Sequence, residues 1–251
     1  MKQSGIVSRL FLAIDDTDNL NSAGTGHVLE GFRDLLAARG IETQAISRHQ
    51  LYFHEDVPYT SHNSSMCTEM VVPKDIVPEI IELASGHLAD SFVDGSDPGL
   101  CAACADDIPN IAALIAYGRR GKSSLLTKDE AYSLAKEQNI HLSEHGGTGD
   151  GVVGALAGVA LRISGFDGRI KGKVDVGTGG EVFTVSGLLQ RTGFSSVMAI
   201  NGAAIRGDEK VTLSEGRIKA VRINWQSTIL VSPSSDRDAF FTIPHELLKV
   251  Y

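Results

Sequence analysis

An apolar run that ends directly in a cluster of carboxylates constrains the fold of this chain more than any other feature. Residues 9–14 (RLFLAI) are followed at once by Asp15, Asp16 and Asp18. A short apolar run bounded by polar residues is typical of a strand buried on both faces. We therefore expect a buried strand that brings acidic side chains to its carboxyl end, where α/β folds hold their ligands.

The segments after this strand alternate between helical and extended hydrophobic periods. The expected elements are helices at 27–39, 76–88, 108–117, 128–137 and 155–162, and strands at 41–53 and 66–72. This order predicts an α/β fold, in the form of an α+β mixed sheet with helices packed on it. The first elements, taken in order, suggest a sandwich with the helices on one face of the sheet.

The composition changes after Gly165, where short β-rich runs alternate with Gly, Asn and Asp turns. These runs lie at 181–189, 210–213, 218–225 and 229–231. The pattern predicts two domains, a larger one over residues 1–165 and a small, all-β C-terminal unit over residues 166–251.

The net charge of −8 disfavours tight binding of nucleic acid, because such binding depends mostly on clustered Lys and Arg. No apolar stretch reaches the length of a membrane span, and residues 1–9 lack the features of a signal peptide. We therefore expect a cytoplasmic protein. Cys67, Cys101 and Cys104 are predicted to be reduced thiols, because their number is odd and no export signal is evident. The C-x-x-C pair has the spacing of a redox site or of half a zinc site, but a zinc ribbon would need a second pair, so small buried residues are the favoured interpretation.

The carboxylate cluster predicts a cation site. Asp15, Asp16 and Asp18 repel one another, and a divalent cation is the usual neutralising partner. Hard oxygen ligands suit Mg²⁺, which often also binds substrate phosphates. In an extended chain Asp16 and Asp18 would share one face, which leaves Asp15 a supporting role. An Asx turn with a helix cap is the alternative, although a turn needs fewer acidic residues.

Two glycine-rich segments predict sites for anions. Gly24 and Gly26 flank Thr25 at the start of the first expected helix, where free backbone amides favour an anion. Thr25 is a candidate for phosphate binding or for a nucleophile, with a helix N-cap as the alternative. The second segment is G-x-G-x-x-G at residues 149–154. It is either a phosphate cradle or a flexible hinge, because no strand is expected before it.

Five motifs occur in the same order as in the catalytic domain of the tRNA agmatinylcytidine synthetase family, which modifies an isoleucine tRNA. They are AIDDTD at 13–18, Thr25 at the position of the phospho-accepting threonine, VPYTSHN at 57–63, DPG at 97–99 and GDGVVGALA at 149–157. Residues from about 10 to 162 therefore resemble that ATP-using domain.

This resemblance implies roles for particular residues. Asp15, Asp16 and Asp18 would bind Mg²⁺ and the phosphates of ATP, and Thr25 would accept a phosphoryl group. The residues implied to contact the nucleotide are Gly24, Gly26, Tyr59, His62, Asn63, Gly149, Asp150, Gly151 and Gly154. Catalysis in such a site consists of positioning and charge stabilisation.

The chain also departs from the family pattern. Thr60, Ser61 and His62 replace the basic residues of the family's loop, and Asp150 replaces an arginine. The family's RNA-binding and zinc modules have no counterpart in residues 166–251. We hypothesise an ATP- and Mg²⁺-dependent phosphoryl-transfer or activating enzyme for a small or nucleotide-like substrate, and we do not expect it to bind tRNA directly. A non-catalytic nucleotide-binding sensor and a tRNA-modifying subunit that needs an RNA-binding partner are the alternatives.

Overall fold

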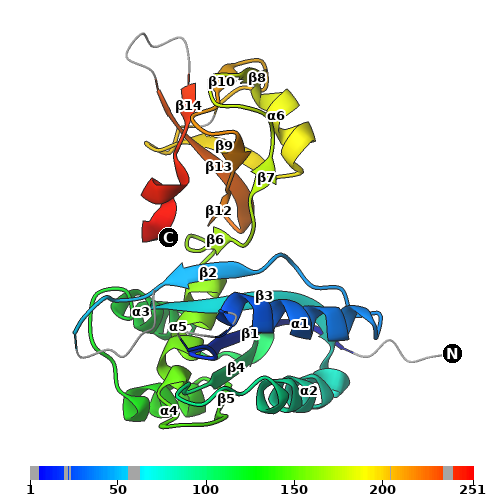
Figure 1. Cartoon of the computed structure of the whole chain (residues 1–251). Coiled ribbons are helices and arrows are strands. Elements are labelled where there is room, and N and C mark those ends of the chain that lie inside the picture. Colours follow the sequence, from blue (N-terminus) through cyan, green and yellow to red (C-terminus); the bar gives the residue numbers. More distant parts are fainter. Residues whose placement is uncertain (1–5, 20–21, 23, 56–62, 204, 234–239) are drawn as a thin grey trace, which may run out of the picture. The chain divides into compact units, whose positions relative to one another are not determined.

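The chain forms two compact units, Met1–Ser164 and Gly165–Tyr251, each with its own apolar core (Figure 1). The structure, a computed structural model, describes residues 6–19, 22, 24–55, 63–203, 205–233 and 240–251. Tyr59 and His62, which are expected to contact a nucleotide, lie outside these residues. Within the described ranges, no helix has the length and apolar character needed to cross a membrane.

The sheet of the first unit is built around β1, which has a partner strand on each side. Its order is β5-β4-β1-β3-β2, and every pair of neighbours is antiparallel. The strands are β1 (Val7–Asp15), β2 (Ser47–Gln50), β3 (Ser64–Pro73), β4 (Gly99–Cys104) and β5 (His141–Glu144). Leu10, Leu12 and Ile14 of β1 belong to one core cluster, and Phe11 and Ala13 belong to another. Both faces of β1 are therefore covered, which explains its unbroken apolar sequence.

Helices cover both faces of this sheet (Figure 1). The helices of the first unit are α1 (Thr25–Ala37), α2 (Val77–Asp90), α3 (Ile111–Arg120), α4 (Lys128–Glu137) and α5 (Gly151–Ser164). The first two pack against one face, and the other three pack against the opposite face. The suggestion of helices on one face is wrong, because it rested on the first part of the chain, which supplies only α1 and α2.

The strand expected at 41–53 is much shorter in the structure. Only Ser47–Gln50 pairs as a strand, with an isolated bridge between Thr43 and Met70. The backbone before it touches β3 irregularly, since Gln44 N–H donates to Glu69 O. By contrast, α4 has the predicted bounds, because Thr127 and Glu130 form a reciprocal capping box at its start.

The second unit contains most of the short strands. Its main sheet has the order β6-β12-β13-β14-β10-β8, and β9 joins it by pairing in parallel with β13. The strands are β6 (Arg169–Ile170), β8 (Val182–Thr184), β9 (Ser196–Ala199), β10 (Lys210–Thr212), β12 (Val221–Ile223), β13 (Gln226–Pro233) and β14 (Phe240–Thr242). A separate ribbon pairs β7 (Val174–Asp175) with β11 (Arg217–Ile218). The predicted mixed α/β fold with a β-rich C-terminal unit is confirmed.

The expectation that the C-terminal unit is entirely β is wrong, because it contains α6 (Val185–Thr192). Thr184 caps this helix by accepting a hydrogen bond from Gly187 N–H, and Gly193 ends it with a φ of 70°. The run at 181–189 is thus a three-residue strand followed by a helix. The run at 218–225 is also divided, because Asn224 and Trp225, with φ of 51° and 59°, form the turn between β12 and β13.

The three cysteines are free thiols, as predicted. Cys101 and Cys104 lie on β4 and pack into the cores on opposite faces of the sheet. The C-x-x-C pair therefore does not converge on one ligand.

Candidate functional site

The carboxylate cluster lies where β1 leaves the sheet. Asp15 is the last residue of β1 and is only 8% exposed, and its Oδ1 accepts a hydrogen bond of 2.9 Å from Asp16 N–H. Asp16 has a φ of 52°, in the left-handed region. The extended backbone on which the shared face of Asp16 and Asp18 was predicted is therefore absent, and the chain turns at Asp16 toward the start of α1.

The second glycine segment docks against this cluster. Asp97 N–H donates to Asp16 O (3.1 Å), and Gly151 N–H donates to Asp97 O (3.0 Å). A Cβ added at Gly154 would lie 1.6 Å from Asp15 Oδ2, so glycine is required for helix α5 to approach the buried carboxylate. The expectation that no strand precedes this segment is wrong, since β5 ends at Glu144.

The first glycine segment places Thr25 in contact with Asp18. Thr25 Oγ1 donates to Asp18 Oδ1 (2.6 Å), and Thr25 N–H donates to the same oxygen (3.2 Å). Gly24 is the N-cap residue and Thr25 is the first residue of α1, so the alternative of Thr25 as the N-cap is wrong. The Asp18 carboxylate acts as the cap instead, and it holds the buried Thr25 hydroxyl in a fixed position.

Burial and mutual repulsion make two of the carboxylates weak acids. Burial, with the neighbouring Asp16 charge, raises the pKa of Asp15 to about 8. Burial and the charges of Asp97, Asp18 and Asp150 raise the pKa of Asp16 to about 7. The site therefore carries more negative charge than its surroundings neutralise, and near neutral pH it has to take up either protons or a cation.

The residues present fit Mg²⁺ held partly by other groups. No set of three His, Cys, Asp or Glu side chains in the described part of the chain is arranged to hold a metal ion by itself. Mg²⁺ in nucleotide sites, however, is usually held by one or two carboxylates together with phosphates and water. The hydroxyl of Thr17, inside the acidic motif, is buried and has no hydrogen-bond partner among the described residues. A bound water or phosphate oxygen would satisfy it.

The remaining predicted residues occupy different positions around this cluster. Asp150 is exposed, although its charge affects Asp16. Gly149 has a φ of 75°, and a Cβ added there would lie 2.0 Å from Glu144 Oε2. Gly26 is buried in the first turn of α1. Asn63 has a structural contact, since its Nδ2 donates to Tyr52 O (2.7 Å).

Sequence reasoning missed two residues of the cluster. Asp97 belongs to a predicted motif but not to the predicted site, and it joins Asp16 to the glycine segment through its backbone. Arg48 on β2 is absent from the prediction, yet its charge affects the pKa of Asp15. The missed signal was a basic residue in a strand that otherwise supplies uncharged buried side chains.

Replacing Asp15 with asparagine is expected to stabilise the metal-free protein at about pH 8 by a few kcal/mol. Because the pKa of Asp15 is raised, the folded state keeps a proton that the unfolded state releases. The contribution of this proton to the stability of the unaltered protein is therefore full below the ordinary pKa of 3.8 and is lost as the pH rises toward about 8. Asparagine keeps the acceptor for Asp16 N–H and has no charge to lose. Urea unfolding followed by helical circular dichroism should show a gain that shrinks toward pH 4. A gain that is independent of pH would contradict the assignment of this charge.

Comparisons with known proteins identify the fold of part of the chain. No protein-family model matches it, and no curated protein matches it in sequence. The solved structures that it resembles include a complex of TiaS with an isoleucine tRNA and ATP (TM-score 0.53, 19% identity) and apo TiaS, an isoleucine-tRNA agmatidine synthetase (TM-score 0.52, 19% identity). Another is a tRNA fluorescent labeling enzyme (TM-score 0.52, 20% identity).

These matches cover 61% of this chain but only 35–36% of the matched chains, so this protein spans little more than a third of their length. The structural part of the predicted resemblance, a fold shared with TiaS, is confirmed.

Proposed function

We propose that this chain is an ATP- and Mg²⁺-dependent enzyme that transfers a phosphoryl group or activates a small or nucleotide-like substrate. The observation that carries the proposal is the meeting of Asp15, Asp16, Thr25 and the glycine segment at one end of a sheet. The fold is shared with TiaS, one structure of which is a complex with ATP and another a complex with AMPCPP and agmatine.

Asp15, Asp16 and Asp18 are the residues that would hold Mg²⁺. When bound, the ion would neutralise charge on the phosphates and on the carboxylates. The N-terminal ends of α1 and α5 would attract the phosphates through their helix dipoles, since the start of a helix favours an anion.

Thr25 is the proposed phosphoryl acceptor. Its Oγ1–H already donates to Asp18 at 2.6 Å, which is the geometry of a nucleophile beside a base. Attack of Thr25 Oγ1 on the terminal phosphorus would form a new O–P bond while the bond to the ADP oxygen breaks. The hydroxyl proton would pass to the Asp18 carboxylate.

Asp150 is proposed to face a cation. It stands where the resembled family has arginine, and it adds to the negative charge around Asp16. A second metal ion or a positively charged substrate would compensate this charge.

Calorimetric titration with ATP, with and without Mg²⁺, followed by product analysis, tests the proposal. Mg²⁺-dependent binding with formation of ADP, AMP or phosphorylated Thr25 is expected. Binding without any product would favour the nucleotide sensor, and salt-sensitive binding of tRNA would favour the RNA-modifying subunit. Absence of ATP binding under both conditions would overturn the proposal.

A further inference from the structure

Arg48 is a basic side chain at the candidate site, and only its Nε forms a hydrogen bond with a described residue. It is partly buried in the middle of β2, where it pairs with Met66 of β3, and Met66 in turn pairs with Ile14, the residue before Asp15. Its Nε donates to Ser64 Oγ on β3 (2.8 Å). Its two Nη groups form no hydrogen bond or ion pair with any described residue. Among the residues that the structure describes, these donors of the guanidinium therefore have no acceptor.

The positive charge of Arg48 interacts with the carboxylates of the cluster. It lowers the pKa of Asp15, while Asp18 and Asp15 favour the charged form of Arg48. Burial nevertheless lowers the pKa of Arg48 below its usual range, so these carboxylates do not fully compensate the loss of water. An anion beside Arg48 would supply the missing compensation.

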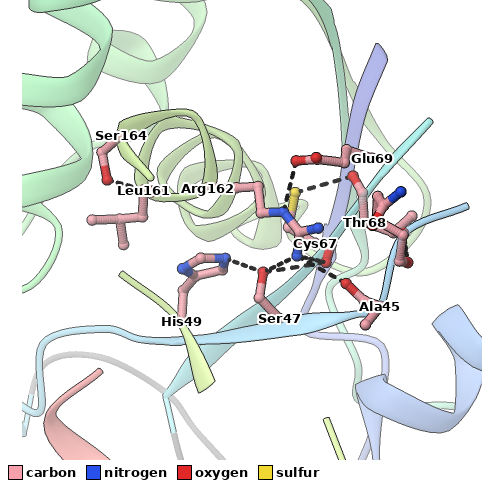
Figure 2. A network of polar contacts seen from close by, with 10 residues as sticks. Ala45, Ser47, His49, Cys67, Thr68, Glu69, Leu161, Arg162 and Ser164 are labelled. Carbon is pink, nitrogen blue, oxygen red and sulfur yellow. Dashed lines mark hydrogen bonds and ion pairs between the residues drawn. The ribbon is translucent and has the colours of Figure 1, made fainter. Parts of the chain in front are cut away.

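The backbone on either side of Arg48 is held by a buried polar network (Figure 2). Arg162 of α5 donates through Nη1 to Ser47 Oγ (2.7 Å) and to Ala45 O (2.9 Å). Ser47 Oγ also contacts His49 Nε2 (2.7 Å), and both side chains are fully buried. Because side chains alternate along a strand, Arg48 extends from the opposite face of β2, the side on which Ser64 receives it.

We propose that Arg48 binds the phosphate groups of the nucleotide and stabilises the charge that develops on them during transfer. This inference rests on the proposed function and assigns a residue to it. Arginine suits the role because its planar guanidinium can donate two parallel hydrogen bonds to a phosphate. The network around Arg162 fixes the strand, so little ordering of the backbone would be required on binding.

Affinities of the unaltered protein and its Arg48→Ala and Arg48→Lys variants for ATP, tripolyphosphate and adenosine, each with Mg²⁺, test this inference. Arg48→Ala should weaken ATP and tripolyphosphate binding by about tenfold to a hundredfold, as expected for the loss of charge-assisted hydrogen bonds. Adenosine binding should not change, and Arg48→Lys should recover part of the loss. Arg33→Ala is the control, since Arg33 of α1 binds Thr43 Oγ1 and is outside the cluster.

The outcomes separate this inference from the proposed function. If the unaltered protein binds ATP and Arg48→Ala binds it equally well, the role of Arg48 is overturned and the proposed function stands. Equal weakening of adenosine and tripolyphosphate would assign Arg48 a purely structural role and would also overturn it. If the unaltered protein binds neither ATP nor tripolyphosphate, both proposals are overturned.

Discussion

Replacing Asp16 with asparagine is expected to lower Mg²⁺-dependent turnover of ATP by at least about a hundredfold, because it removes a hard charged ligand from the centre of the site. Asp16 is the residue on which the charges of Asp97, Asp18 and Asp150 converge. Steady-state product formation at saturating ATP measures the effect. Since the pKa of Asp16 is raised to about 7, activity of the unaltered protein should also fall as the pH drops below that value.

Asp90→Asn is the matched control for this experiment. Asp90 is an exposed residue at the end of α2, so the same change of charge there should leave turnover unaltered. An Asp16→Asn variant that folds normally and keeps its Mg²⁺ dependence would remove the carboxylate cluster from the mechanism.

Replacing Arg162 with alanine is expected to destabilise the first unit by about 3–5 kcal/mol, the usual cost of breaking a buried ion pair. The Arg162 side chain is fully buried, and its Nε donates to Glu69 Oε2 at 3.1 Å. Its removal leaves the Glu69 carboxylate buried without its arginine. It also removes the hydrogen bonds that Arg162 donates to Ser47 Oγ and Ala45 O. Helical circular dichroism during urea unfolding follows the first unit, which contains most of the helices. Fluorescence of Trp225, the single tryptophan, follows the second unit.

A double-mutant cycle distinguishes the ion pair from loss of packing. Glu69→Gln should recover part of the stability in the Arg162→Ala background, because it removes the buried charge. Arg120→Ala is the control, since its ion pair with Glu130 is exposed and its loss should have a much smaller effect. No recovery in the double variant would indicate that Arg162 stabilises the fold by its volume alone.

The parts of the fold that follow local rules were predicted well. Helix α4 has the predicted bounds, because Thr127 and Glu130 are three residues apart and cap it without help from distant segments. The strand β1 was predicted from its apolar run, which any sheet covered on both faces would need. The helix α6 was missed because the run at 181–189 opens with the β-branched residues Val182, Thr184 and Val185, and the caps at Thr184 and Gly193 outweigh that preference for a strand.

The candidate site was predicted only in part, since its members come from segments far apart in the chain. The acids after β1 and the glycines before α5 were each evident as patterns. Their meeting through the Asp97 backbone was not, because hydrogen bonds between residues more than fifty positions apart leave no local period. Arg48 escaped notice for the same reason, as its relation to Asp15 depends on which strands are neighbours.

The sequence by itself determined that an apolar strand ends in Asp15, Asp16 and Asp18, and that amides at two glycine segments precede helices. These features depend on residues within a few positions of one another. Only the tertiary structure decided that helices cover both faces of the sheet, that Gly154 must be glycine to admit the Asp15 carboxylate, and that Arg162 is buried beneath β2. Those outcomes depend on the order and register of the strands, which the packing of the whole unit selects.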